Sequence, residues 1–196
     1  MLSRRWLLAI AAVAVLPLGA CQVPAPAPTL PELTYAHLGP IRLDVARIEI
    51  VDDYLPPLRR PNVEHEFPIP PADAARRWVN DRLQAAGRQR TARFFIRTAA
   101  VVETKLDRRG GLAGAFTTDQ SERYNATLEV ALEIRSESGQ REAYVEARSE
   151  NTRTVSEKAS INDRERVYFE MTEFLMKAVN AELEAQINQH FGRFRR

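Results

Sequence analysis

The sequence predicts an α+β fold, a two-layer sandwich in which two helices cover one face of a four-stranded, mostly antiparallel sheet. Apolar and polar residues alternate in four stretches between residues 41 and 155, as in strands with one buried face. Apolar residues recur at helical spacing in two other stretches, 71–86 and 160–191. The elements follow in the order β-α-β-β-β-α. Because only one face of the clearest strands is apolar, both helices are expected on that face.

The first strand is expected at 41–54. Its apolar residues change phase near Val45-Ala46-Arg47, where a β-bulge would keep one continuous inner face. The stretch 55–71 holds six prolines and is expected to be a stiff loop. It leads to Pro71, because proline is favoured at the first position of a helix.

The first helix is expected to span 71–86. Gly87 follows directly, in the position where glycine commonly ends a helix. The apolar stripe consists of Ala75, Trp78, Val79, Leu83 and Ala86. Because Trp78 lies within this stripe, we expect it to be a core residue rather than a platform for a ligand.

Three more strands are expected, at 92–105, 123–136 and 140–155. In the first, the residues expected to face inward are Phe94, Ile96, Ala100 and Val102. The second has the clearest alternation, with Tyr124, Ala126, Leu128, Val130, Leu132 and Ile134 inward. In the third, the inward residues are Ala143, Val145 and Ala147. Ser138-Gly139 suits a tight hairpin turn between the last two strands.

The last element is expected to be a long helix that starts after Ser160 and runs to about Phe191, before Gly192. Ser160 is a suitable N-cap, and Asp163 is favourable in the first turn. The apolar stripe comprises Val167, Met171, Phe174, Leu175, Ala178, Leu183 and Ile187. At 1.5 Å per residue this helix is longer than about 40 Å, which exceeds the width of four strands, so its end is expected to protrude.

Residues 1–20 have the features of a secretory signal peptide. Arg4 and Arg5 precede an uncharged apolar run, 6–18. A basic start, an apolar run of about 7–15 residues and small residues before a cleavage site are typical of such signals. The run is shorter than the roughly 20 apolar residues of a transmembrane helix, and Pro17 interrupts it.

Leu18-Gly19-Ala20-Cys21 resembles the lipobox of bacterial lipoproteins, which is an aliphatic residue, two small residues and a cysteine. The resemblance implies that the Cys21 thiol receives a diacylglycerol, that residues 1–20 are removed, and that the new amino group is acylated. Two or more acyl chains, palmitate among them, make attachment effectively permanent. By the same resemblance, Gln22 favours the outer membrane over the inner membrane. The alternative is an ordinary signal with a chance cysteine at its end.

Cleavage before Cys21 changes the charge and the chemistry of the chain. Removing Arg4 and Arg5 from the 28 basic residues leaves 26, equal to the 26 acidic residues. A neutral mature chain offers no general electrostatic reason to bind nucleic acid. Because Cys21 is the single cysteine, lipidation leaves no thiol for a disulfide, a metal or a nucleophile.

Three regions follow from these patterns: the signal peptide 1–20, the lipidated cysteine with a tether at 21–40, and one α+β domain at 41–196. Four prolines between residues 22 and 31 stiffen the tether. A proline-rich segment of this length spaces the domain about 30 Å from the lipid.

No catalytic, cofactor-binding or metal site is predicted. The histidines His37, His65 and His190 lie far apart, and in Glu64-His65-Glu66 we expect a histidine exposed on a proline-rich loop rather than a metal site. The glycine-rich stretch 110–114 lacks both the lysine and the following helix of a phosphate-binding loop. No nucleophile elbow or dinucleotide fingerprint is present either. An enzyme is therefore not expected.

Two apolar or basic segments are candidates for partner contact. Leu112 and Phe116 lie on the glycine-rich hairpin, where they either cap the core or dock on a partner or lipid. Arg193 and Phe194, in the basic C-terminal tail, either touch anionic headgroups or belong to a frayed terminus.

The lipobox and the element order together resemble small periplasmic lipoproteins that serve envelope machines. Examples are the lipoprotein partner of the lipopolysaccharide-assembly pore and the auxiliary lipoproteins of lipid-handling ABC transporters. The resemblance implies a non-enzymatic accessory or assembly subunit with an envelope protein as partner. One alternative is a module that binds a lipid or another apolar ligand between sheet and helices, and a second is a hydrolase with an unrecognised site.

Overall fold

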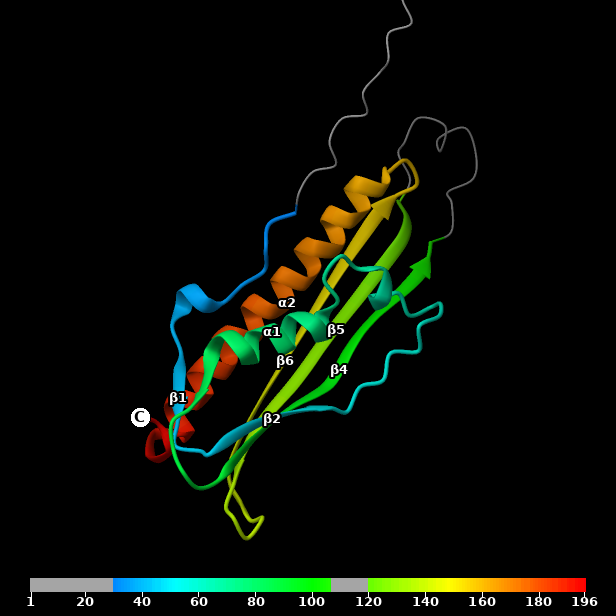
Figure 1. Ribbon diagram of the computed structural model, residues 1–196. Coiled ribbons are helices and arrows are strands. Elements are labelled where there is room, and N and C mark those ends of the chain that lie inside the picture. The colour runs from blue at the N-terminus through cyan, green and yellow to red at the C-terminus, as the bar shows by residue number, and fades with distance from the viewer. Residues whose placement is uncertain (1–29, 107–119) are drawn as a thin grey trace, which may run out of the picture.

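The computed structural model describes residues 30–106 and 120–196 and confirms the α+β sandwich. The main sheet has the order β2-β4-β5-β6. Its strands are β2 (Arg47–Asp52), β4 (Thr91–Lys105), β5 (Gln120–Arg135) and β6 (Arg141–Ser156). Strands β4, β5 and β6 are antiparallel neighbours, whereas β2 runs parallel to β4. The helices α1 (Pro71–Arg82) and α2 (Ile161–His190) lie on one side of this sheet (Figure 1).

Strand β5 forms the centre of the core, as its uninterrupted alternation predicts. Every second side chain from Tyr124 to Ile134 is buried. Trp78 of α1 is fully buried beside Phe94 of β4, with ring centroids 5.7 Å apart, and its indole N–H donates to Asn180 of α2 at 2.8 Å. The prediction that Trp78 is a core residue is therefore confirmed.

Strand β4 carries a β-bulge that the sequence analysis did not predict. Its pairing with β5 shifts between Ile96 and Thr98. Beyond this point the buried side chains are Ala99, Val101 and Glu103. The expectation that Ala100 and Val102 face inward is wrong, because the extra residue, Arg97, moves all later side chains to the opposite face.

The expected first strand is in fact two strands that belong to different sheets. A three-residue strand, β1 (Ile41–Leu43), pairs in parallel with β3 (Leu83–Ala85), and β2 begins only at Arg47. The N–H of Val45 donates to the carbonyl oxygen of Leu43 at 2.8 Å, so the chain turns here. The change of apolar phase marks a break between two sheets, and the predicted bulge is wrong.

Helix α1 ends at Arg82 rather than at Ala86, because the next three residues leave the helix and pair with β1. Gly87 therefore does not end a helix. A Cβ at Gly87 would lie 2.6 Å from the carbonyl carbon of Asp44 and 2.7 Å from the backbone nitrogen of Val45. Glycine is needed here because two backbone segments approach closely.

The proline-rich segment 55–71 protects the edge of β4 beyond the end of β2. Val63 donates its N–H to the carbonyl oxygen of Val101 at 2.9 Å. The buried carboxylate of Glu64 accepts the N–H of Val101 at 3.1 Å and the hydroxyl of Tyr54 at 2.8 Å. These bonds occupy backbone groups that another strand could otherwise pair with.

Helix α2 begins with the predicted cap. Ser160 Oγ accepts the N–H of Asp163 at 3.2 Å, and the Asp163 carboxylate accepts the N–H of Ser160 at 3.2 Å. The helix then lies lengthwise along β6 (Figure 1). A strand of 16 residues spans roughly 50 Å. A helix of 30 residues spans about 45 Å, so the expectation that its end protrudes is wrong.

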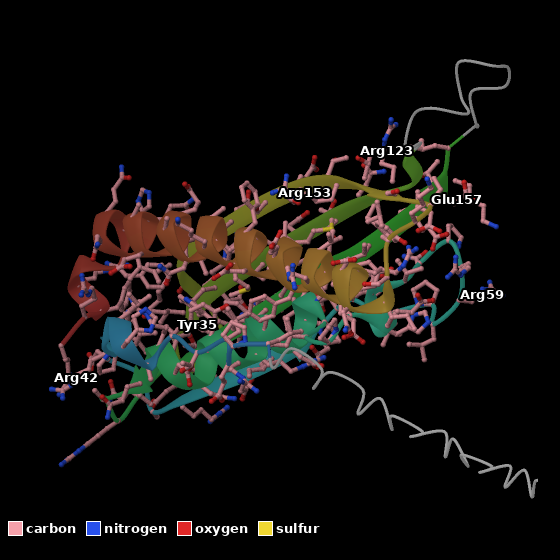
Figure 2. The ribbon with its side chains drawn as sticks, turned by 90° about the horizontal axis from the view of Figure 1, so that it is seen from above. Tyr35, Arg42, Arg59, Arg123, Arg153 and Glu157 are labelled. Atoms are coloured by element: carbon pink, nitrogen blue, oxygen red, sulfur yellow. The ribbon has the colours of Figure 1, made fainter. Side chains whose placement is uncertain are left out.

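The buried face of α2 matches the predicted stripe in part. Met171, Leu175, Leu183 and Ile187 are buried, whereas Phe174 is 46% exposed. The side chains buried in addition to the stripe are Tyr168, Phe169, Thr172, Met176 and Val179. Figure 2 shows Arg42 at the end of the molecule where α2 finishes and Glu157 at the end where α2 begins.

Candidate functional site

The residues with the strongest sequence signals lie outside the described part of the chain. Cys21, Leu112 and Phe116 fall within 1–29 and 107–119. Lipidation of Cys21, and contact through Leu112 and Phe116, therefore stay predictions.

The C-terminal tail is part of the folded domain. Phe194 is 2% exposed, and its ring lies edge-on to that of Phe191 with centroids 6.2 Å apart. The exposed Arg193 places its guanidinium over the Phe194 ring and donates to the carbonyl oxygen of Glu142 at 3.2 Å. Headgroup contact through the Phe194 side chain is wrong, because that side chain is buried. Contact through Arg193 stays a prediction.

Backbone hydrogen bonds hold the tail beside β1. The N–H of Asp44 donates to the carbonyl oxygen of Phe194 at 2.7 Å, and that of Arg196 donates to the carbonyl oxygen of Arg42 at 3.1 Å. The Arg196 guanidinium also pairs with the Asp44 carboxylate at 2.6 Å. A frayed terminus, the alternative drawn from the sequence, is therefore wrong as well.

No group of three or more His, Cys, Asp or Glu side chains in the described ranges could hold a metal ion. In Glu64-His65-Glu66, His65 is exposed and the Glu64 carboxylate is bonded to Val101 and Tyr54. Burial, together with the hydrogen bond to Glu64, raises the pKa of the Tyr54 hydroxyl. Through Glu64, this segment forms a hydrogen bond to the edge of β4.

The sheet face opposite the helices carries a cluster of aromatic and arginine side chains. Ala131 of β5 forms its floor, paired with Phe95 of β4 on one side and Glu146 of β6 on the other. Ala131 is 0% exposed although neither α1 nor α2 covers this face. The rings of Phe95 and Tyr144 nearby are half-buried. We define the open-face cluster as Phe95, Ala131 and Tyr144 with Arg93, Arg97 and Arg141.

Arg97 bridges the two rings of the open-face cluster. Its guanidinium carbon lies 5.7 Å from the ring centroid of Phe95 and 5.9 Å from that of Tyr144. Arg93 lies over Phe95 at 5.0 Å, and Arg141 lies over Tyr144 at 4.9 Å. Distances of this kind are typical of cation–π contacts. Three guanidinium groups thus converge on two rings.

These arginines differ in their carboxylate partners. Arg93 lies 3.6 Å from both Glu49 and Glu133, and its Nε is buried without a hydrogen-bond acceptor. Within the described ranges, neither Arg97 nor Arg141 has an ion pair with a carboxylate. The open-face cluster therefore combines two arginines that have no carboxylate partner in the described ranges with a nearby carboxylate, that of Glu146, which accepts the hydroxyl of Tyr144 at 2.6 Å.

A hollow of about 460 Å³ adjoins the open-face cluster beside the hairpin between β5 and β6. Its cationic lining residues are Arg47, Arg88, Arg90, Arg93 and Arg135, and its carboxylates are Glu49 and Glu137. The described lining residues include no histidine or cysteine. This composition suits the binding of acidic groups better than covalent chemistry, which needs an activated nucleophile.

At the other end of the sheet, a hydrogen-bonded network joins α2 to β5. Arg164 pairs with the carboxylate of Glu122, and the hydroxyl of Tyr124 donates to the same carboxylate at 2.8 Å. Although burial acts in the opposite direction, these hydrogen bonds hold the pKa of Glu122 below its ordinary value. The Tyr124 ring lies edge-on to Tyr168, which stacks on Phe67 at 4.2 Å. We call this network of Arg164, Glu122 and Tyr124 the clasp, because it joins α2 to β5.

The open-face cluster was not predicted from the sequence. A usable signal was present in Arg93-Phe94-Phe95-Ile96-Arg97, where two arginines and an aromatic residue occupy alternate positions on the polar side of a strand. Tyr144 could not be joined to them, because the strand register and the bulge were needed to bring it near.

No protein-family model matches the chain, and no curated protein matches it either. Among solved structures, the chain is similar to the crystal structure of the rare lipoprotein B from Shewanella oneidensis, with 9% sequence identity and a TM-score of 0.36. The match covers 73% of this chain and 95% of that chain. A likeness this distant carries no argument about function.

Helices long and apolar enough to cross a membrane are absent from the described ranges.

Proposed function

We propose that the protein is a membrane-anchored periplasmic lipoprotein that acts as a non-enzymatic accessory or assembly subunit of a cell-envelope complex. The proposal joins an anchor read from Leu18-Gly19-Ala20-Cys21 to a folded domain that follows a proline-rich tether. The acyl chains on Cys21 would hold it in the membrane, with the outer membrane favoured by Gln22.

The observation that carries the proposal is the uncovered face of the main sheet. Both helices lie on the opposite face, and on the uncovered face the guanidinium of Arg97 contacts the rings of both Phe95 and Tyr144. Aromatic residues and arginine are the residue types enriched where proteins bind one another. An accessory subunit needs such a surface, whereas a hydrolase needs a nucleophile beside a base.

The packing between sheet and helices does not favour the alternative of an apolar ligand held there. Trp78 stacks on Phe94 in this layer, and both are fully buried, as is Leu128, so these side chains occupy space that a lipid chain would need. We therefore place the accessory role ahead of ligand carriage.

Labelling with palmitate tests the anchor. The wild-type chain, expressed in a bacterium, should incorporate labelled palmitate and sediment with membranes, and Cys21→Ala should abolish both. Incorporation that persists in Cys21→Ala would contradict the anchor.

Crosslinking in intact cells, followed by purification of the chain, tests the accessory role. A defined integral envelope protein should be recovered with the wild-type chain in a fixed ratio. Recovery of bound lipid after denaturation, with no protein partner, would favour the ligand-binding alternative instead.

A further inference from the structure

We propose that the open-face cluster binds an acidic segment of a protein partner, whose Asp or Glu carboxylates pair with Arg97 and Arg141. This inference rests on the proposed function, since it names the chemistry of the partner that an accessory subunit would hold. It assigns the contact to the uncovered sheet face rather than to the helices, the hairpin tip or the tail.

The guanidinium groups of Arg97 and Arg141 lie close to aromatic rings. The guanidinium of Arg97 lies near the rings of both Phe95 and Tyr144, and the guanidinium carbon of Arg141 lies 4.9 Å from the ring centroid of Tyr144. A guanidinium held over a ring still has N–H groups that can point away from it, and the guanidinium fork matches a carboxylate in a two-pronged hydrogen bond. The rings restrain the arginines, so less side-chain entropy is lost when a partner binds.

The second argument is the β-bulge in β4. The bulge makes Arg97 the extra residue of the strand, opposite no single partner in β5. A bulge re-aims a side chain, and here it points the guanidinium of Arg97 across β5 toward Tyr144 of β6. The bulge thus positions Arg97 at the centre of the open-face cluster.

The third argument is charge complementarity. Arg97 and Arg141 lack a carboxylate partner within the described ranges, and the adjoining hollow adds further arginines. Carboxylates also lie on this face: Glu146 accepts the hydroxyl of Tyr144, Glu133 is bonded to Arg135, and Glu129 and Glu150 are paired with Arg148. A uniformly anionic bilayer would meet these carboxylates unfavourably, whereas a protein segment can match positive and negative positions in register.

The test uses the full lipidated chain in its native membrane. A photoreactive amino acid replaces Ala100, which lies on the open face beyond the bulge, or, in a matched control, Glu170, which is exposed on α2. The charge-reversal variant is Arg97→Glu with Arg141→Glu. Its control is Arg153→Glu, an exposed arginine of β6 whose strand partner Tyr124 faces the helices (Figure 2).

The crosslinker at position 100 should give one protein adduct, and mass spectrometry should find Asp or Glu side chains in the crosslinked peptide. Charge reversal at Arg97 and Arg141 should reduce the adduct by about tenfold or more, while Arg153→Glu leaves it unchanged. Reversing the acidic residues of the partner peptide to arginine should restore it. The neutral pair Arg97→Gln and Arg141→Gln, with a melting curve like that of wild type, controls for misfolding.

The possible negative results distinguish the acidic-segment inference from the accessory role. An adduct at position 100 that survives charge reversal, or a protein adduct formed only at position 170, would overturn the inference and leave the accessory role standing. A photoproduct that contains phospholipid and no protein would overturn the inference in favour of the bilayer. The lack of a protein adduct at every exposed position tried, on helices and sheet alike, would sink the accessory role together with the inference.

Discussion

The two faces of the main sheet bury side chains by different means. On one face, Leu128 and Leu132 of β5 are fully buried, and both helices lie on this side of the sheet. On the other face Ala131 of the same strand is equally buried, although no helix of the described chain lies over it. Its strand partners, Phe95 of β4 and Glu146 of β6, carry larger side chains, and Arg97 lies near the rings of Phe95 and Tyr144. The open face is thus an organised surface, and its order comes from side chains alone.

The largest expected effect separates the two faces at adjacent positions of β5. Leu128→Ala should lower the free energy of unfolding by about 2–5 kcal/mol, because it leaves a cavity under the helices. Thr127→Ala, on the open face, should change it by less than about 0.5 kcal/mol. Denaturant unfolding of the two variants measures both. If both variants lose the same free energy of unfolding, the open face is packed as tightly as the covered face, and the proposed difference between the two faces is wrong.

The second effect concerns a charge buried on the covered side. Arg82 at the end of α1 is 1% exposed, its Nε and Nη1 have no hydrogen-bond partner, and its Nη2 lies 3.3 Å from Glu184 of α2. Glu184→Gln removes the countercharge and should cost about 1–3 kcal/mol. This is less than for a fully buried pair, because Glu184 is 45% exposed and solvent screens the interaction.

Two further variants sharpen this second prediction. Glu173→Gln, at an exposed position of the same helix, should leave the unfolding free energy within about 0.5 kcal/mol of wild type. Arg82→Met combined with Glu184→Gln should be more stable than Glu184→Gln alone, because the uncompensated buried charge is gone. If the double variant is no more stable, burial of the arginine is not the cause.

The third effect is a pH dependence at the clasp between α2 and β5. The pKa of Glu122 is lowered in the folded chain, so the ionised form favours folding. This contribution is fully present above the unfolded value of about 4.3 and is lost as the pH falls through the folded pKa. Wild type should therefore melt at a higher temperature than Glu122→Gln at pH 7, with the gap narrowing below about pH 4. A gap that stays constant down to that range would refute the linkage.

The smallest effect on stability is expected at the centre of the open-face cluster. Arg97→Ala removes two exposed cation–π contacts and should cost at most about 1 kcal/mol. The same change should strongly weaken partner crosslinking if the proposed contact is right. Thermal melting and crosslink yield, measured on the same variant, separate a residue that supports the fold from one that serves binding.

Much of the fold could be predicted from the sequence because its signals are local. The alternation from Tyr124 to Ile134, the turn at Ser138-Gly139 and the cap at Ser160 each lie within a few residues, and all three are found in the structure. The resemblance of Leu18-Gly19-Ala20-Cys21 to a lipobox is a local signal too, and the proposed location in the envelope rests on it.

Tertiary contacts decided the rest, because they join residues that are distant along the chain. Gly87 lies against the backbone of Asp44 and Val45, a close approach of two segments that the local pattern, typical of a helix end, does not reveal. Phe194 is buried in the core, where backbone hydrogen bonds join the tail to residues in and beside β1. No apolar periodicity in the tail sequence indicates this. Arg97 acquires its position from a bulge and a strand register. Local pattern thus determined which elements form, whereas long-range packing determined where they end and which side chains they bring together.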